Sequence, residues 1–155
     1  MKIRRDFVTN SSSSSFVVSF DKIPTDYHEL KTMLFGDDEY FNTYNKTIPT
    51  VTLSEVIFND MKSRGKADVE LLIRELMNGY VYDAHDAPDY MDYKSYDDYR
   101  FASMVYFTDF INAHFSDLLN VFILEYGNEV DGPFADILED DRIFKRVRCI
   151  KIDKS

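Results

Sequence analysis

The sequence predicts an α+β fold in which a small, mainly antiparallel sheet of about four strands packs against four to five helices. Strand-like apolar runs lie near both ends of the chain, and amphipathic helical patterns lie between them. The composition is 45% hydrophobic and 15% aromatic, which suits a folded core. A chain of 155 residues has the size of one domain, so we expect a single domain over 1–155.

The first twenty residues predict an antiparallel hairpin of two strands, 2–8 and 14–20. The residues between the strands, above all a serine run, favour a turn. The N-terminal hairpin is therefore expected to span 2–20. In its second strand the larger apolar residues recur at every second position, namely Phe16, Val18 and Phe20.

The middle of the chain, 25–119, is predicted to be mainly helical. Asp26 can cap a first helix, with Glu29 three residues later as its capping-box partner, and Gly36 can end it. Residues 37–50 are polar and aromatic without a clear period, so we expect an irregular loop there.

Two further helices are expected before the second half of the chain. The first begins with a capping-box pattern at Thr52 and stops near Gly65. The second runs over 67–77, with Gly79 as its C-terminal stop.

A long helix is predicted from Asp97 or Asp98 to Leu119. Aromatic residues widen the apolar face of this helix until apolar side chains nearly surround it. We therefore expect it to be the central helix, with the helices packed on one face of the sheet. The residues predicted to point inward are Phe101, Met104, Val105, Ile111, Phe115, Leu118 and Leu119.

The C-terminal part, 121–152, predicts a strand, a turn, a short helix and a final strand. The run of four apolar residues that begins at Val121 suits a strand buried on both faces. Pro133 suits the first position of the short helix, and the final strand is expected at about 145–152. The single cysteine, Cys149, lies in this strand and is expected to be a packed, unreactive residue.

The charge distribution limits the kinds of molecule that the chain is expected to bind. The formal net charge of −10 disfavours direct binding to nucleic acid, which uses clustered Lys and Arg side chains against the phosphates. The negative charge is concentrated in 81–99 and 125–141, between basic segments near the two ends. The chain shows no apolar signal-peptide region and no long apolar run, so we expect a cytoplasmic protein that does not enter a membrane.

Two segments resemble those of a known group of proteins. The segment from Asp6 to Phe16, read as Asp-Phe-Val-Thr-Asn, five serines and Phe, is similar to the opening signature of a group of uncharacterised bacterial and phage proteins. The segment 125–132, followed by Leu138-Glu139 and Ile143-Phe144, resembles a C-terminal strand–turn–helix found with that signature. The resemblance implies a bacterial or mobile-element setting and transfers no activity and no catalytic residues.

The serine run is a candidate site with two interpretations. Its hydroxyl and amide groups could cradle an anion, accept phosphate or expose a nucleophile, but it lacks the glycines and the lysine of a phosphate-binding loop. We favour a flexible polar loop, because serine-rich tracts stay mobile. The residues of this predicted serine loop are Asn10, Ser11, Ser12, Ser13, Ser14 and Ser15.

A second candidate site lies in 83–92, which gathers four carboxylates and an imidazole. Oxygen ligands suit Mg²⁺ or Mn²⁺, and an added histidine suits Mn²⁺ or Fe²⁺. One alternative function is therefore a divalent-metal-dependent hydrolase, although a solvated acidic loop is the simpler interpretation. The ligands in that hypothesis are Asp83, His85, Asp86 and Asp89.

The richest binding signal is the interleaving of tyrosines and aspartates over 80–99. Tyrosine offers a large contact area at low entropic cost, and spaced carboxylates suit a basic partner. The competing interpretation is a long loop with its rings inward and its carboxylates outward, but loops of this length are usually functional or disordered. The residues of the predicted surface are Tyr82, Asp89, Tyr90, Asp92, Tyr93, Tyr96, Asp97 and Asp98.

We therefore predict an acidic protein-binding accessory or regulatory module whose partner is a basic protein. Inhibition of a basic host protein or of a nucleic-acid-binding protein is a concrete form of this hypothesis. The metal-dependent hydrolase is one alternative, and a structural subunit of a larger assembly is another. No catalytic residue is assigned, no cofactor is expected outside the metal hypothesis, and the oligomeric state is left open.

Overall fold

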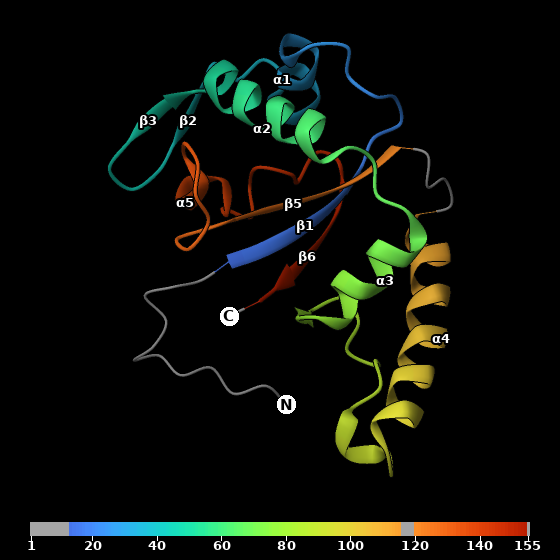
Figure 1. Cartoon of the computed structure of the whole chain (residues 1–155). Helices are drawn as coiled ribbons and strands as arrows, with labels where there is room; N and C mark the ends of the chain where they lie inside the picture. The colour runs from blue at the N-terminus through green and yellow to red at the C-terminus, as the bar shows by residue number, and fades with distance from the viewer. Residues whose placement is uncertain (1–12, 116–119, 155) are drawn as a thin grey trace.

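The computed structural model describes residues 13–115 and 120–154, and these residues form an α+β architecture (Figure 1). The main sheet has four antiparallel strands in the order β4-β6-β1-β5, and β2 and β3 form a separate hairpin. The predicted fold class is confirmed. The strands are β1 (Ser13–Ser19), β2 (Tyr40–Asn42), β3 (Thr47–Pro49), β4 (Tyr80–Val81), β5 (Val121–Gly127) and β6 (Arg148–Asp153).

Three of the described helices begin at a capping side chain, whereas α2 begins after Pro49 without one, so the predicted capping start at Thr52 is wrong. Asp26, Asp68 and Ser95 cap α1, α3 and α4, each accepting a hydrogen bond from the backbone N–H three residues later. None of the described helices is both long and apolar enough to cross a membrane. The helices are α1 (Tyr27–Phe35), α2 (Thr50–Arg64), α3 (Val69–Met77), α4 (Tyr96–His114) and α5 (Ala135–Leu138), with a 3₁₀ turn, η2, at Tyr90–Asp92.

β1 is the inner strand on which the sheet is built. It pairs with β5 along one edge from Ser13 to Ser19 and with β6 along the other edge from Ser14 onward. Both edges are therefore occupied, so the predicted hairpin pairing between 2–8 and 14–20 is wrong. Residues 2–8 themselves lie outside the described residues. The partners of β1 come from the C-terminal part of the chain instead.

One face of the sheet carries the larger apolar core. Phe16, Val18 and Phe20 point to this face and share one buried cluster with residues of α1, α2 and α5. Phe16 packs against Phe144, with ring centroids 5.2 Å apart. Burying a side chain of this size contributes about 1.5–3 kcal/mol. The predicted alternation of β1 is confirmed.

The opposite face of the sheet is covered by α3 and α4 (Figure 1). Val17 of β1 points to this side and joins Leu72 and Leu76 of α3 and Phe110 of α4 in a second core. The expectation that the helices pack on one face is therefore wrong. The reason lies in residues 16–18, which are apolar at consecutive positions and give the inner strand two apolar faces.

α4 covers the second core from outside and is not a central helix. Phe107 and Phe110 are buried, whereas Phe101 is 71% exposed. Figure 1 shows the first half of α4 extending beyond the sheet together with the segment that precedes it. The predicted inward direction is wrong for Phe101, Met104 and Val105, and it is confirmed for Ile111 and Phe115. Leu118 and Leu119 lie outside the described residues.

Residues 37–50 hold the β2–β3 hairpin, so the prediction of an irregular loop is wrong. Phe41 and Ile48 lie opposite each other in the hairpin and are buried in the core beside α1 and α2. Each of these strands is three residues long and buries one residue. A single buried residue gives no detectable period, which is why the strands do not show in the sequence pattern.

Candidate functional site

Four tyrosine rings gather where η2 leads into α4. The ring centroid of Tyr99 lies 5.5 Å from that of Tyr90, 6.1 Å from that of Tyr93 and 6.2 Å from that of Tyr96. We name these four residues the tyrosine cluster. Tyr90 is 52% exposed and Tyr96 is 55% exposed. The rings therefore form part of the surface, and the structure does not support the interpretation that they all point inward.

Two capping side chains shape the segment that carries this cluster. Asp89 Oδ1 accepts a hydrogen bond of 3.0 Å from the N–H two residues later and begins η2. Ser95 Oγ accepts one of 3.1 Å from the first turn of α4. Tyr96 and Tyr99 are three residues apart in the helix and are therefore neighbours on its surface. The two caps thus bring the tyrosines before α4 against those in its first turn.

Carboxylates surround the tyrosine cluster. The segment 89–101 contains only Lys94 and Arg100 as positively charged residues. Its four aspartates are all exposed and give this part of the surface a negative charge, which attracts a positively charged surface. These four residues are Asp89, Asp92, Asp97 and Asp98.

Exposed apolar side chains extend this surface, and the sequence analysis missed them. Met91 is 83% exposed, and Val105, one helical turn after Phe101, is 49% exposed. Phe101 and Val105 are neighbours on the helix surface, and contiguous exposed apolar residues of this kind mark interaction sites. The polar residues Thr108 and Asn112 continue the line of Phe101 along the helix, which was the available signal that this stripe leaves the core.

Two hollows lie on either side of Tyr99. The first, which we name the α3–α4 groove, has a volume of about 470 Å³ and includes Arg74 and Arg100 in its walls. The second, which we name the tyrosine hollow, has a volume of about 630 Å³ and lies between the segment 84–91 and the helices α3 and α4. Its aromatic walls are Tyr80, Tyr90, Tyr99 and Phe107.

The four ligands of the metal hypothesis do not form a site. His85 Nδ1 lies 3.2 Å from the carbonyl oxygen of Tyr82, and Asp89 caps η2. In the described part of the chain, which includes all of 83–92, no three His, Cys, Asp or Glu side chains are grouped so that they could hold a metal ion. The structure therefore does not bring together Asp83, His85, Asp86 and Asp89.

The serine run enters the sheet, so the loop prediction is wrong for Ser13, Ser14 and Ser15, which belong to β1. Ser14 Oγ donates to Glu139 Oε2 on one face of the sheet, and Ser15 Oγ donates to Glu75 Oε1 on the other, both at 3.0 Å. Buried hydroxyls need such acceptors, and these carboxylates provide them. Asn10, Ser11 and Ser12 lie outside the described residues.

Glu75 is the centre of a polar group on the α3 side of the sheet. Lys154 Nζ lies 3.0 Å from Glu75 Oε1 and 3.7 Å from Glu125 Oε2. Ser15 is 0% exposed, so no substrate could reach its hydroxyl. The structure therefore supports an anchoring role for Ser15 and gives no support to a nucleophile.

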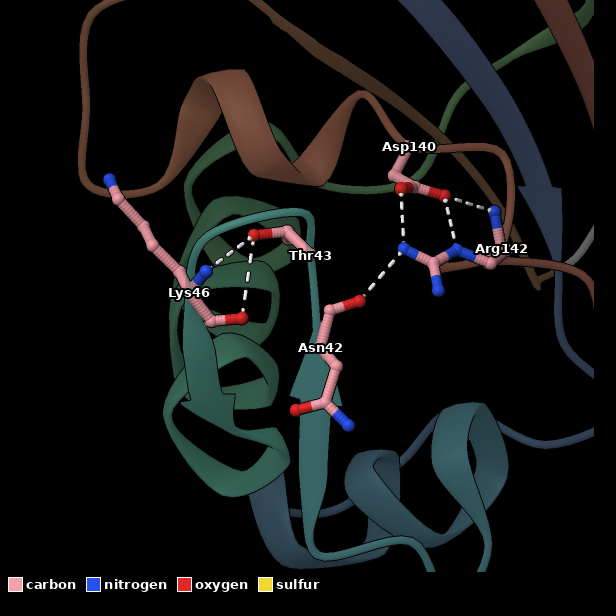
Figure 2. Close-up of polar contacts among 5 residues, drawn as sticks. All are labelled: Asn42, Thr43, Lys46, Asp140 and Arg142. Atoms are coloured by element: carbon pink, nitrogen blue, oxygen red, sulfur yellow. Dashed lines mark hydrogen bonds and ion pairs between the residues drawn. The ribbon is translucent and has the colours of Figure 1, made fainter.

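A further hollow, of about 650 Å³, lies between the tip of the β2–β3 hairpin and the segment after α5. Arg142 links the two sides of this hollow. Its guanidinium donates a hydrogen bond of 3.0 Å to the carbonyl oxygen of Asn42 and pairs with Asp140 at 2.9 Å (Figure 2). The hydrogen bond from Arg142 holds the pKa of Asp140 below its usual value. Lys151 pairs with Asp141 at 2.6 Å. These carboxylates are already matched by cations of the chain, which disfavours this hollow as a site for a cationic partner.

Cys149 is partly buried against the larger core and lines a hollow together with Phe144 and Val147. Burial, with smaller contributions from Asp141 and Asp83, raises the pKa of its thiol to about 12. The thiol is therefore protonated near neutral pH, as the sequence predicts for a packed residue.

Comparisons with protein-family models, with curated proteins and with solved structures each found no match for this chain. The resemblance of the segments 6–16 and 125–144 to bacterial and phage proteins stays a prediction. The functional interpretation therefore depends on the residues of the chain itself.

Proposed function

We propose that this protein is a binding module that holds a basic protein partner on the acidic, tyrosine-rich surface formed by residues 89–101. The observation that carries the proposal is the exposure of Tyr90, Tyr96 and Phe101 beside four exposed aspartates. Aromatic side chains contribute much of the binding energy at protein interfaces. The aspartates determine which partner approaches, because they attract positive surfaces and repel negative ones.

The charge of the whole chain supports the same partner. The formal net charge is −10, so an acidic protein is repelled before contact and a basic one is attracted. Attraction between exposed charges is screened by salt over about 10 Å at 0.1 M ionic strength. Binding should therefore weaken as the salt concentration rises, and the loss should appear mainly in the association rate.

Matched charge variants test the proposal. A pull-down first captures a basic protein, and the association rate of each variant with that protein is then measured. The test variant replaces Asp89, Asp92, Asp97 and Asp98 by Asn, and the control variant neutralises four exposed acidic residues elsewhere, Asp37, Glu55, Glu129 and Asp131. We expect the test variant to bind a captured basic protein about tenfold more slowly or worse, whereas the control variant keeps most of the association rate. Equal losses in the two variants would show that only net charge matters and would contradict the proposed surface.

A second pair of variants separates contact from charge. Tyr96→Ala and Phe101→Ser remove exposed rings without changing any charge, and we expect both to increase the dissociation rate. Tyr44→Ala removes an exposed ring at the tip of the β2–β3 hairpin and serves as the control. Unchanged dissociation in Tyr96→Ala and Phe101→Ser would show that the partner binds elsewhere.

A further inference from the structure

The tyrosine hollow is walled by aromatic rings. Tyr90 and Tyr99 meet at an interplanar angle of 65° with centroids 5.5 Å apart, so two of the walls stand at a steep angle to each other. Tyr80 and Phe107 supply further rings. The volume of about 630 Å³ lies within the range of ligand sites, which is about 300–1,000 Å³. The faces of aromatic rings carry partial negative charge, so an aromatic lining of this kind favours a cation.

The charges around the hollow favour a cation. Asp89 lines it, and no Lys or Arg is found among the described residues of its walls. The neighbouring α3–α4 groove differs, because Arg74 and Arg100 line it and Glu70 there already pairs with Arg74 at 3.7 Å. A positive group is therefore disfavoured in the groove, whereas the hollow offers it aromatic rings without a cation among the described wall residues.

We propose that the tyrosine hollow receives a lysine or arginine side chain of the basic partner, held by cation–π contact with the rings of Tyr90 and Tyr99. A cation within about 6 Å of a ring centroid is attracted by the ring face. Asp89, which caps η2, lies in the wall of the same hollow. The inference rests on the proposed function and names the chemical group of the partner that the surface recognises. The rest of the surface then contacts the residues that flank this side chain.

The inference is tested with a peptide in which glycine and lysine alternate and with the same peptide carrying norleucine in place of lysine. Norleucine keeps the carbon chain and lacks the charge. NMR titration of the full chain should shift the ε-methylene protons of a bound lysine upfield, because the rings of the hollow lie beside them. We expect the lysine peptide to bind, with nuclear Overhauser contacts to the rings of Tyr90 and Tyr99, and the norleucine peptide to bind much more weakly.

Ring variants show whether the aromatic faces are responsible. Tyr90→Leu and Tyr99→Leu should each raise the Kd for the lysine peptide about 3- to 30-fold and reduce the upfield shift. Tyr90→Phe and Tyr99→Phe keep the ring and should bind nearly as well as the unaltered chain. Tyr44→Leu removes an exposed ring outside the hollow and should change nothing. If Tyr99→Leu does not fold, Tyr90→Leu alone tests whether the rings bind the lysine peptide, because Tyr90 is exposed and its replacement should not disturb the core.

The outcomes separate this inference from the proposed function. Lysine-peptide binding that depends on the four aspartates, but shows no upfield shift and no loss in Tyr90→Leu, overturns the inference and leaves the proposed function. Equal binding of the norleucine peptide also overturns it, because the hollow would then be an apolar site. Absence of any binding of the lysine peptide to the full chain contradicts both.

Discussion

At the scale of single residues, Ser15 shows why a serine stands in an inner strand. Its hydroxyl reaches Glu75, a carboxylate that also pairs with Lys154, so the polar group at this end of the sheet is joined to α3. An apolar residue in the same position would leave Glu75 with fewer donors in a poorly solvated place. Hydrogen bonds to charged groups contribute about 1.5–3 kcal/mol.

Removal of this hydroxyl gives the first prediction. Ser15→Ala should lower the free energy of unfolding by about 1–3 kcal/mol, because Glu75 loses one buried donor. Urea denaturation followed by circular dichroism measures the change. Ser13→Ala is the control, since Ser13 is only partly buried, and should stay within about 0.5 kcal/mol. Similar losses in the two variants would contradict the anchoring role.

The thiol of Cys149 gives a prediction about pH. Burial raises its pKa to about 12 in the folded chain, whereas an unfolded cysteine has a pKa of about 8.5. Because the folded-state pKa is the higher one, the unfolded chain ionises first, and stability from this group is lost as the pH rises from about 8.5 toward 12. Alkylation with iodoacetamide at about pH 9 should be slow in the folded chain and fast in urea. Equally fast alkylation in both states would contradict this environment.

Whether the role of a residue could be predicted from the sequence depends on how far along the chain its hydrogen-bond partner lies. The Asp26 cap could be predicted, because its acceptor and donor lie three residues apart. The roles of Ser14 and Ser15 could not, because their acceptors lie 125 and 60 residues away in the sequence. A serine-rich stretch with distant partners has the same local pattern as a flexible loop.

At the scale of elements, the existence of α4 could be predicted and its burial could not. Periodicity reports which residues share a face, whereas the element that covers that face is decided by the tertiary structure. The first half of α4 keeps apolar residues on a side that remains exposed, including Phe101 and Val105. That exposed side is where we place the partner.

A matched pair of variants in α4 gives the third prediction. Phe107→Ala should lower the free energy of unfolding by about 3–5 kcal/mol, because it opens a cavity in the second core. Phe101→Ser should stay within about 0.5 kcal/mol, because the side chain is 71% exposed. Thermal or urea denaturation measures both. A large loss in Phe101→Ser would show that this face of α4 is covered.

The short edge strand β4 depends on Gly79, which gives the fourth prediction. A Cβ atom at Gly79 would lie 2.7 Å from the carbonyl oxygen of Asp153 and 2.6 Å from Ile152 Cγ2, so the backbone of β6 would have to move. Gly79→Ala should therefore cost about 1–3 kcal/mol and weaken the β4–β6 pairing. Amide hydrogen exchange at Val81 and urea denaturation measure these effects. Asn78→Ala, at an exposed neighbouring position, is the control, and an equal effect there would contradict the close approach.

At the scale of the whole molecule, the inner strand β1 determines the architecture. Its consecutive apolar residues give it two faces to cover, and α1, α2 and α5 cover one while α3 and α4 cover the other. The antiparallel class could be predicted from short strands near both ends of the chain. The strand order could not, since pairs such as Ser13 and Gly127 are far apart in sequence and leave no local signal.

The same architecture separates the two acidic segments. Residues 125–141 lie along β5 and α5, where internal cations match several of their carboxylates, as with Asp140 and Asp141. Residues 81–99 lie before and at the start of α4, where tyrosines alternate with the carboxylates. A basic partner is attracted by both acidic segments, but of the two only 81–99 has exposed aromatic rings.

Amide chemical-shift mapping of the full chain with the lysine peptide tests this claim most directly. We expect the shifts to concentrate in residues 80–101 and to be lost when Asp89, Asp92, Asp97 and Asp98 are replaced by Asn. The control that neutralises Asp37, Glu55, Glu129 and Asp131 should leave them in place. Shifts concentrated in 125–141, or equal losses in the two variants, would contradict binding at residues 80–101.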